Sequence, residues 1–210
     1  EIARRDADLA QFAAWAITDL EMRDELVRQM LKHPHIMVHY HCYEALSLAC
    51  RQSPDLFYCY WPDLIPLLKH PGTYHREFGL TLLAHLSGAD REDRLAAVLN
   101  DYLACLYDSK ISVARCCAQH CLEIVDNVPK LGETIYAAVL EADARSPYPA
   151  KQRDLLKSDV LAVLDRLYPT LVDRRHADEF ILTARDCSSP RARKLARELT
   201  IKYGVGSKPG

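Results

Sequence analysis

The densest group of possible metal ligands in this sequence is the run His33–Cys42, which contains four histidines and one cysteine. In a helix, which turns by about 100° per residue, His35, His39 and Cys42 would fall within an arc of about 60°. Imidazole nitrogens and thiolates are good zinc ligands. Three interpretations stay open: a metal site, histidines that cap a helix or border the core, and a pH-responsive surface.

A second run, Cys116–His120 together with Cys121, raises the same question. Cys117 and Cys121 fall on the apolar stripe of a helical pattern, and Cys116 and His120 flank that stripe. Small thiols are among the most frequently buried side chains, which favours a role in the core. The eight cysteines of the chain show no paired spacing, so we expect reduced thiols and a cytoplasmic location.

Basic residues gather at the C-terminal end of the chain. Residues 170–210 hold nine Lys/Arg and five Asp/Glu, although the whole chain has a formal net charge of −2. Arginine suits the recognition of carboxylates and phosphates, whereas a terminal repeat also needs a polar outer face. A solvated cap, an acidic protein partner and a nucleic acid all stay open for this basic face.

An aromatic group, Phe57–Trp61, lies between two helical patterns. Aromatic side chains are favoured at binding surfaces, and they also fill the gap where a helix starts. Both roles stay open for this group.

Motifs of common enzymes are absent, since the sequence contains no GxGxxG, GK[ST], HExxH or GxSxG. We therefore expect no catalytic residues and no cofactor, and an enzyme assembled from dispersed residues is a less favoured alternative. No apolar run approaches the length of a membrane-spanning helix and no signal peptide is visible, so we expect no membrane partner.

The sequence repeats itself. Leu31-Lys32-His33-Pro34 recurs as Leu68-Lys69-His70-Pro71, 37 positions later, and Leu106-Tyr107-Asp108-Ser109 holds the same place 38 positions further on. Such a period predicts a solenoid of helical hairpins, whose apolar stripes are buried by stacking. Prolines interrupt the pattern at the joints. The repeats are expected at residues 21–51, 63–87, 91–127, 130–168 and 171–203, in one domain over residues 1–203 with a flexible tail at 204–210.

The segments that connect successive helical patterns also match each other. Ser53-Pro54-Asp55-Leu56, followed by a helix expected to start near Asp63 and to include Pro66, has a counterpart in Val128-Pro129-Lys130-Leu131. Asp108 precedes Arg115 by the same spacing as Asp186 precedes Arg193. From about Glu21 to Tyr203 the chain resembles the HEAT-repeat (armadillo-type) proteins. The resemblance implies an all-α, right-handed α-α superhelix of about five hairpins, with Asp–Arg ladders between repeats.

The resemblance further implies a non-catalytic scaffold that binds another protein along its curved inner surface. The second helix of each hairpin would line that surface. The alternative is nucleic-acid binding through the C-terminal basic face, since some HEAT-like proteins repair DNA. The candidate binding residues are His39, Arg76, Arg115, Arg193, Lys194 and Arg197, and the alternative metal ligands are His35, His39 and Cys42.

Overall fold

The computed structural model describes residues 2–206, and all the regular structure in that range is helical. The all-α prediction is therefore confirmed for the described part of the chain. None of its helices has the length and apolar character needed to cross a membrane. The α-helices are α1 (Leu9–Thr18), α2 (Leu20–Lys32), α3 (Ile36–Gln52), α4 (Pro54–Phe57), α5 (Trp61–Leu64), α6 (Thr73–Leu86), α7 (Arg94–Ala104), α8 (Ile111–Asn127), α9 (Gly132–Arg145), α10 (Ala150–Leu167), α11 (Arg175–Ala184) and α12 (Pro190–Tyr203).

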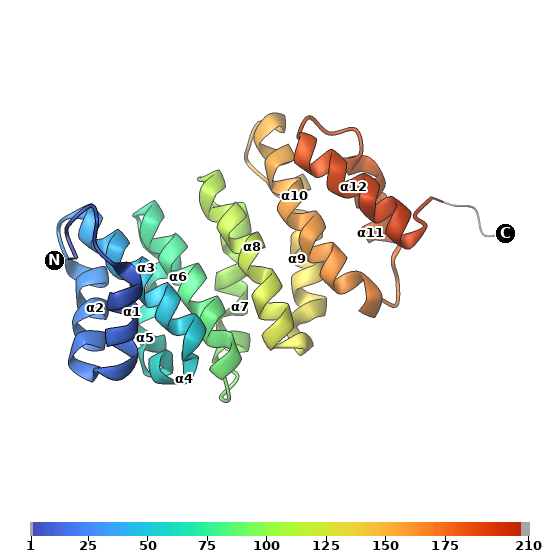
Figure 1. Cartoon of the computed structure of the whole chain (residues 1–210). Coiled ribbons are helices and arrows are strands. Elements are labelled where there is room, and N and C mark those ends of the chain that lie inside the picture. Colours follow the sequence, from blue (N-terminus) through green and yellow to red (C-terminus); the bar gives the residue numbers. More distant parts are fainter. Residues whose placement is uncertain (1, 207–210) are drawn as a thin grey trace. The chain divides into compact units, whose positions relative to one another are not determined.

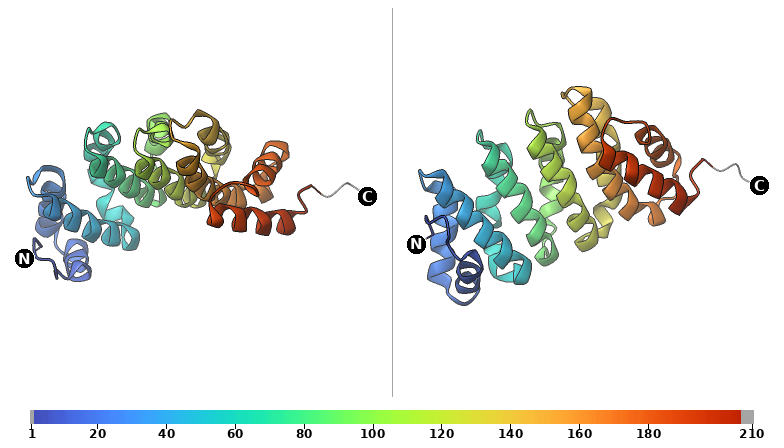
Figure 2. Two further views of the ribbon diagram at one scale, coloured as in Figure 1. Left: turned by 90° about the horizontal axis from the view of Figure 1, so that it is seen from above. Right: turned by 45° about the horizontal axis from the view of Figure 1, so that its top comes forward.

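The chain divides into two compact units, Glu1–Val98 and Leu99–Gly210, here called unit 1 and unit 2, and the division falls within α7. In unit 1, α3 packs against α2 and lies between α1 and α6 (Figure 1). In unit 2, α10 lies between α8 and α12 and also packs against α9 (Figure 2). The single repeat domain and the superhelix remain predictions.

Side chains at the helix starts explain where several helices begin. The carboxylate of Asp8 accepts the backbone N–H of Gln11 at 3.0 Å, and that of Asp19 accepts the N–H of Glu21 at 2.9 Å. The hydroxyl of Ser189 accepts the N–H of Ala192, with a proline at the first helical position. Each cap satisfies a backbone donor that has no partner within its own helix.

The first helix expected for the second repeat, from Asp63 to about His70, is broken. In its place α5 ends at Leu64 and continues as a 3₁₀ turn, Ile65–Lys69. Pro66 accounts for the break because proline has no N–H to donate to the preceding turn, whereas Pro62 lies in the first turn of α5, where that N–H has no partner anyway. The helix α6 then approaches this segment closely, and a Cβ on Gly79 would lie only 2.8 Å from the Cβ of Leu67.

The C-terminal helix ends in an ordered turn. Gly204 has a φ of +66°, a left-handed conformation that glycine adopts without steric cost. The N–H of Val205 then donates to the carbonyl of Thr200 at 3.0 Å, and the Val205 side chain is buried. The tail predicted for residues 204–210 thus begins with a packed turn, and its residues 207–210 lie outside the described residues.

Candidate functional site

Two of the predicted binding residues, Arg76 and Arg193, hold the turn that precedes their own helix. Arg76 donates through Nη1 to the carbonyls of His70 and Pro71, at 2.7 and 3.0 Å. Arg193 donates through Nη1 to the carbonyls of Cys187 and Ser188 at the same two distances. Each arginine is the fourth residue of its helix. The matching geometry gives both side chains a structural role.

Arg115 joins two helices of unit 2. Its Nε lies 2.7 Å from Oδ2 of Asp159 on α10, and Gln119 donates to the other oxygen of the same carboxylate at 3.1 Å. Asp159 is only 2% exposed. A buried carboxylate is costly unless it is paired and hydrogen-bonded, so these two donors stabilise the contact between α8 and α10. The carboxylate of Asp108 accepts the backbone N–H of Lys110 at 2.7 Å.

His39 is buried, and its Nδ1 donates to the carbonyl of Met30 at 2.5 Å. Its ring lies 4.9 Å from that of His75, which stacks on His70 at 4.0 Å. Burial, and after it the two neighbouring imidazoles, lower the pKa of His75 to about 4. The three rings form a histidine cluster: His70 and His75 are stacked, and His39, near the start of α3, meets His75 edge to face.

The alternative metal ligands have other roles in the structure. The Nδ1 of His35 accepts the N–H of Met37 and caps α3. Cys42 is fully buried, and this burial raises the pKa of its thiol to about 12, which opposes the thiolate form that a metal would need. Within residues 2–206, the ligand atoms of these two residues and His39 do not converge as a metal site requires.

Lys194 and Arg197 are the exposed members of the predicted binding set. The Nζ of Lys194 lies 3.9 Å from a carboxylate oxygen of Glu198, an ion pair of exposed side chains that contributes little to stability. Arg197 makes no hydrogen bond or ion pair with the described residues. These two side chains remain available on the basic face.

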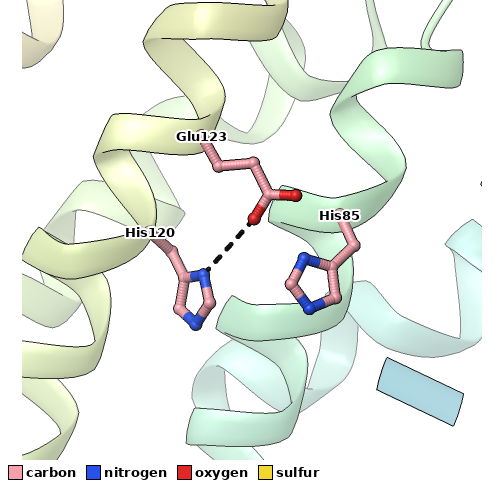
Figure 3. A group of neighbouring side chains, drawn as sticks. All are labelled: His85, His120 and Glu123. Atoms are coloured by element: carbon pink, nitrogen blue, oxygen red, sulfur yellow. Dashed lines mark ion pairs between the residues drawn. The ribbon is translucent and has the colours of Figure 1, made fainter. Parts of the chain in front are cut away.

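The second cysteine run lies largely in the core of unit 2. Cys117 and Cys121 are buried, and the Cys117 thiol donates to the carbonyl of Tyr102 at 3.3 Å. Burial raises the pKa of Cys117 well above its usual value. On the same helix, Nδ1 of His120 lies 3.6 Å from Oε2 of Glu123 (Figure 3). These contacts agree with the core interpretation of the cysteines.

The aromatic group around Trp61 is mainly packing. Phe57 and Trp61 are buried, while the Tyr58 hydroxyl donates to the carboxylate of Asp90 at 2.6 Å. The Tyr60 hydroxyl donates to Asp24. These contacts tie the segment to neighbouring parts of unit 1.

An exposed aromatic cluster that was not predicted from the sequence joins α3 to α6. Tyr40 and Tyr74 are 38% and 51% exposed, and their ring centroids lie 6.4 Å apart. Next to them, Tyr43 stacks on the buried Phe78 at 4.2 Å. We call these four residues the aromatic strip. Its outer rings are exposed while its inner rings are held in place, as expected of an anchored binding surface.

Hydrogen bonds continue the strip along the same two helices. The Tyr43 hydroxyl donates to the hydroxyl of Thr81 at 3.2 Å. Ser47 lies 2.9 Å from Nε2 of His85, to which the Nε of Arg51 also donates. The strip therefore rests on two helices whose relative register is defined by side-chain contacts.

A pocket of about 300 Å³ opens beside the strip, between α1 and α3. Its single carboxylate, Glu44, is a neighbour of Tyr40, and burial followed by this carboxylate raises the pKa of Tyr40. Glu44 forms no ion pair with the described residues. The residues that line the pocket are Leu9, Tyr40, Tyr43, Glu44, Ser47 and Leu48.

Larger pockets lie along α9 in unit 2, with volumes of about 630 and 470 Å³. Several of their carboxylates already have basic partners. Glu141 lies 2.8 Å from Arg145, and Asp173 lies 2.6 Å from Arg175. A ligand there would compete with these pairs, so the pocket of unit 1 is the better candidate for a charged ligand.

One local signal could have identified the pocket. At about 100° per residue, Tyr40, Glu44 and Ser47 fall on one side of α3, opposite the buried stripe formed by Cys42, Ala45 and Ala49. The pattern does not show that Tyr74, 34 positions away, joins the same surface.

No family model matches the chain, and no curated protein and no solved structure is significantly similar to it.

Proposed function

We propose that this chain is a non-catalytic, HEAT-like scaffold that binds another protein, and that the aromatic strip is part of its binding surface. One observation carries the proposal. The rings of Tyr40 and Tyr74 are exposed and adjacent, and they lie next to the stacked rings of Tyr43 and Phe78. Tyrosine supplies a large contact area with few rotatable bonds, and binding hot spots are enriched in it.

The repeat architecture is supported by contacts, within each unit, between helices that lie one sequence period apart. In unit 1, Ser47 and His85 are separated by 38 positions in the sequence. In unit 2, Asp165 accepts a hydrogen bond from Lys202, 37 positions later. These separations equal the period of the sequence, as expected when hairpins stack in register.

The charges favour a protein partner for unit 1. This unit holds ten Lys/Arg and fourteen Asp/Glu, hence a formal charge of −4, whereas unit 2 holds 17 and 15, hence +2. An acidic unit with an aromatic surface does not attract the phosphate backbone of a nucleic acid. Free thiols, most of them buried, fit a reducing compartment such as the cytoplasm.

Affinity capture from native cell extract tests the proposal. The immobilised chain should retain a partner protein, and the Tyr40→Ser/Tyr74→Ser variant should lose it. The matched control is Leu20→Ser on α2, which removes a side chain that is 60% exposed elsewhere in unit 1 and should retain the partner.

Capture by the tyrosine variant at the level of the wild type would contradict the proposed surface. A nuclease-sensitive signal that is lost in Lys194→Ala/Arg197→Ala would favour the nucleic-acid alternative instead, and such binding should fall steeply with salt.

A further inference from the structure

We infer that the pocket between α1 and α3 binds one arginine side chain of the partner protein. This inference rests on the proposed function, because it specifies the kind of segment that the aromatic strip would recognise. The side chains of the pocket supply what a guanidinium on an alkyl stem requires: aromatic faces, a carboxylate and apolar walls.

The aromatic faces come from Tyr40 and Tyr43, whose ring centroids lie 6.0 Å apart with an angle of 51° between the rings. Tyr43 is held by its stack on Phe78 and by its hydrogen bond to Thr81. A guanidinium within about 6 Å of such rings gains cation–π attraction, and its flat shape also allows stacking. Because the Tyr43 ring is already fixed, little side-chain entropy is lost when the ligand binds.

The carboxylate is Glu44, which has the Tyr40 hydroxyl as a neighbour but no basic partner among the described residues. A carboxylate accepts two parallel N–H bonds from a guanidinium. The nearest cation further along α3, Arg51, is directed to His85 at 3.2 Å. The lining of the pocket therefore has one negative charge and no positive charge.

Leu9 and Leu48 form the apolar part of the lining. The three methylene groups of an arginine can lie against such walls while its charged end reaches a carboxylate. A volume of about 300 Å³ is at the lower end of ligand pockets and suits one long side chain rather than a folded element. Lysine would fit the walls, but its compact ammonium neither stacks on a ring nor bonds a carboxylate bidentately.

The test uses the full chain with labelled tyrosine rings and NMR titrations. The probe is acetyl-Ala-Arg-Ala amide, and the comparison peptides carry lysine or uncharged citrulline in place of arginine. We expect the arginine peptide to shift the Tyr40 and Tyr43 signals saturably, with a Kd of about 1 mM, because a single side chain makes few contacts. The citrulline peptide should bind at least about tenfold more weakly, since it lacks the charge.

Glu44→Gln should weaken binding of the arginine peptide by about fivefold. Glu21→Gln, which removes the same charge from an exposed position at the start of α2, should leave the affinity unchanged. Equal binding of arginine and citrulline peptides, equal binding of lysine and arginine peptides, or an unchanged affinity of Glu44→Gln would each overturn the inference.

The two proposals can fail separately. If partner capture depends on Tyr40 and Tyr74 but the arginine peptide does not bind, the arginine inference is wrong and the scaffold proposal stands. If the arginine peptide binds in a Glu44-dependent way but capture is insensitive to the tyrosines, the pocket exists and the proposed binding surface is wrong.

Discussion

Arg115 and Asp159, 44 positions apart in the sequence, form an ion pair at 2.7 Å between α8 and α10. The carboxylate is almost completely buried, whereas the guanidinium is partly exposed. A position that the sequence suggested for partner binding thus contributes to the internal structure of unit 2. The pair joins two helices that α9 separates in the sequence.

Replacement of Arg115 by alanine should destabilise unit 2. Among residues 2–206, the variant leaves the Asp159 carboxylate with Gln119 as its remaining donor. We expect a loss of about 2 kcal/mol, less than for a fully buried pair. Chemical denaturation would measure it. Arg197→Ala should stay within about 0.5 kcal/mol of the wild type because this side chain is exposed and unpaired among the described residues. Equal stabilities of the two variants would contradict the structural role of Arg115.

Removal of Arg193 should loosen the turn before α12. Two hydrogen bonds from Nη1 to backbone carbonyls are lost, which we expect to cost about 1–2 kcal/mol. Hydrogen exchange at residues of α12 would report faster local opening in Arg193→Ala. The neighbouring Lys194→Ala is the control, since the ion pair of Lys194 with Glu198 is long and exposed. A similar acceleration in this variant would show that the turn contacts are unimportant.

The histidine cluster should make unit 1 sensitive to acid. The pKa of His75 is lowered to about 4, from about 6.5 in the unfolded chain, so between these values the unfolded state binds more protons. Stability is therefore lost as the pH falls from 6.5 to 4, by about 1 kcal/mol once the partial exposure of the ring is taken into account.

Denaturation of the wild type and of His75→Gln across this pH range tests the effect. The difference in the free energy of unfolding between the two proteins should change between pH 6.5 and 4 and stay constant above that range. A difference that does not vary with pH would rule out the expected contribution of His75.

A methyl group at Gly79 should separate α6 from the preceding 3₁₀ turn. The added Cβ would lie 2.8 Å from Cβ of Leu67 and 3.4 Å from the Leu64 carbonyl oxygen, so backbone must move. We expect Gly79→Ala to destabilise the protein by about 1–3 kcal/mol, although alanine favours the helical conformation. A thermal unfolding midpoint at or above that of the wild type would show that the two segments are not so closely packed.

The sequence predicted those parts of the candidate site whose residues are close together along the chain. The face of α3 that contains Tyr40 and Glu44 follows from helical spacing alone, because both residues lie on one helix. The contribution of Tyr74 does not follow, because it depends on how α3 packs against α6. The histidines of the run His33–Cys42 show the same limit, since His39 meets the ring of His75 on α6, which in turn stacks on His70 in the turn before that helix.

The sequence by itself determined the all-α character and the points where α8 and α12 end, Asn127 and Tyr203, which match the ends of the expected repeats 91–127 and 171–203. Apolar periodicity, caps and prolines act within a few residues, so they can be recognised along the chain. Only the tertiary structure decided which charges are paired and which aromatic rings stay exposed. Burial and ion pairing depend on side chains more than 30 positions apart, and packing alone brings these together.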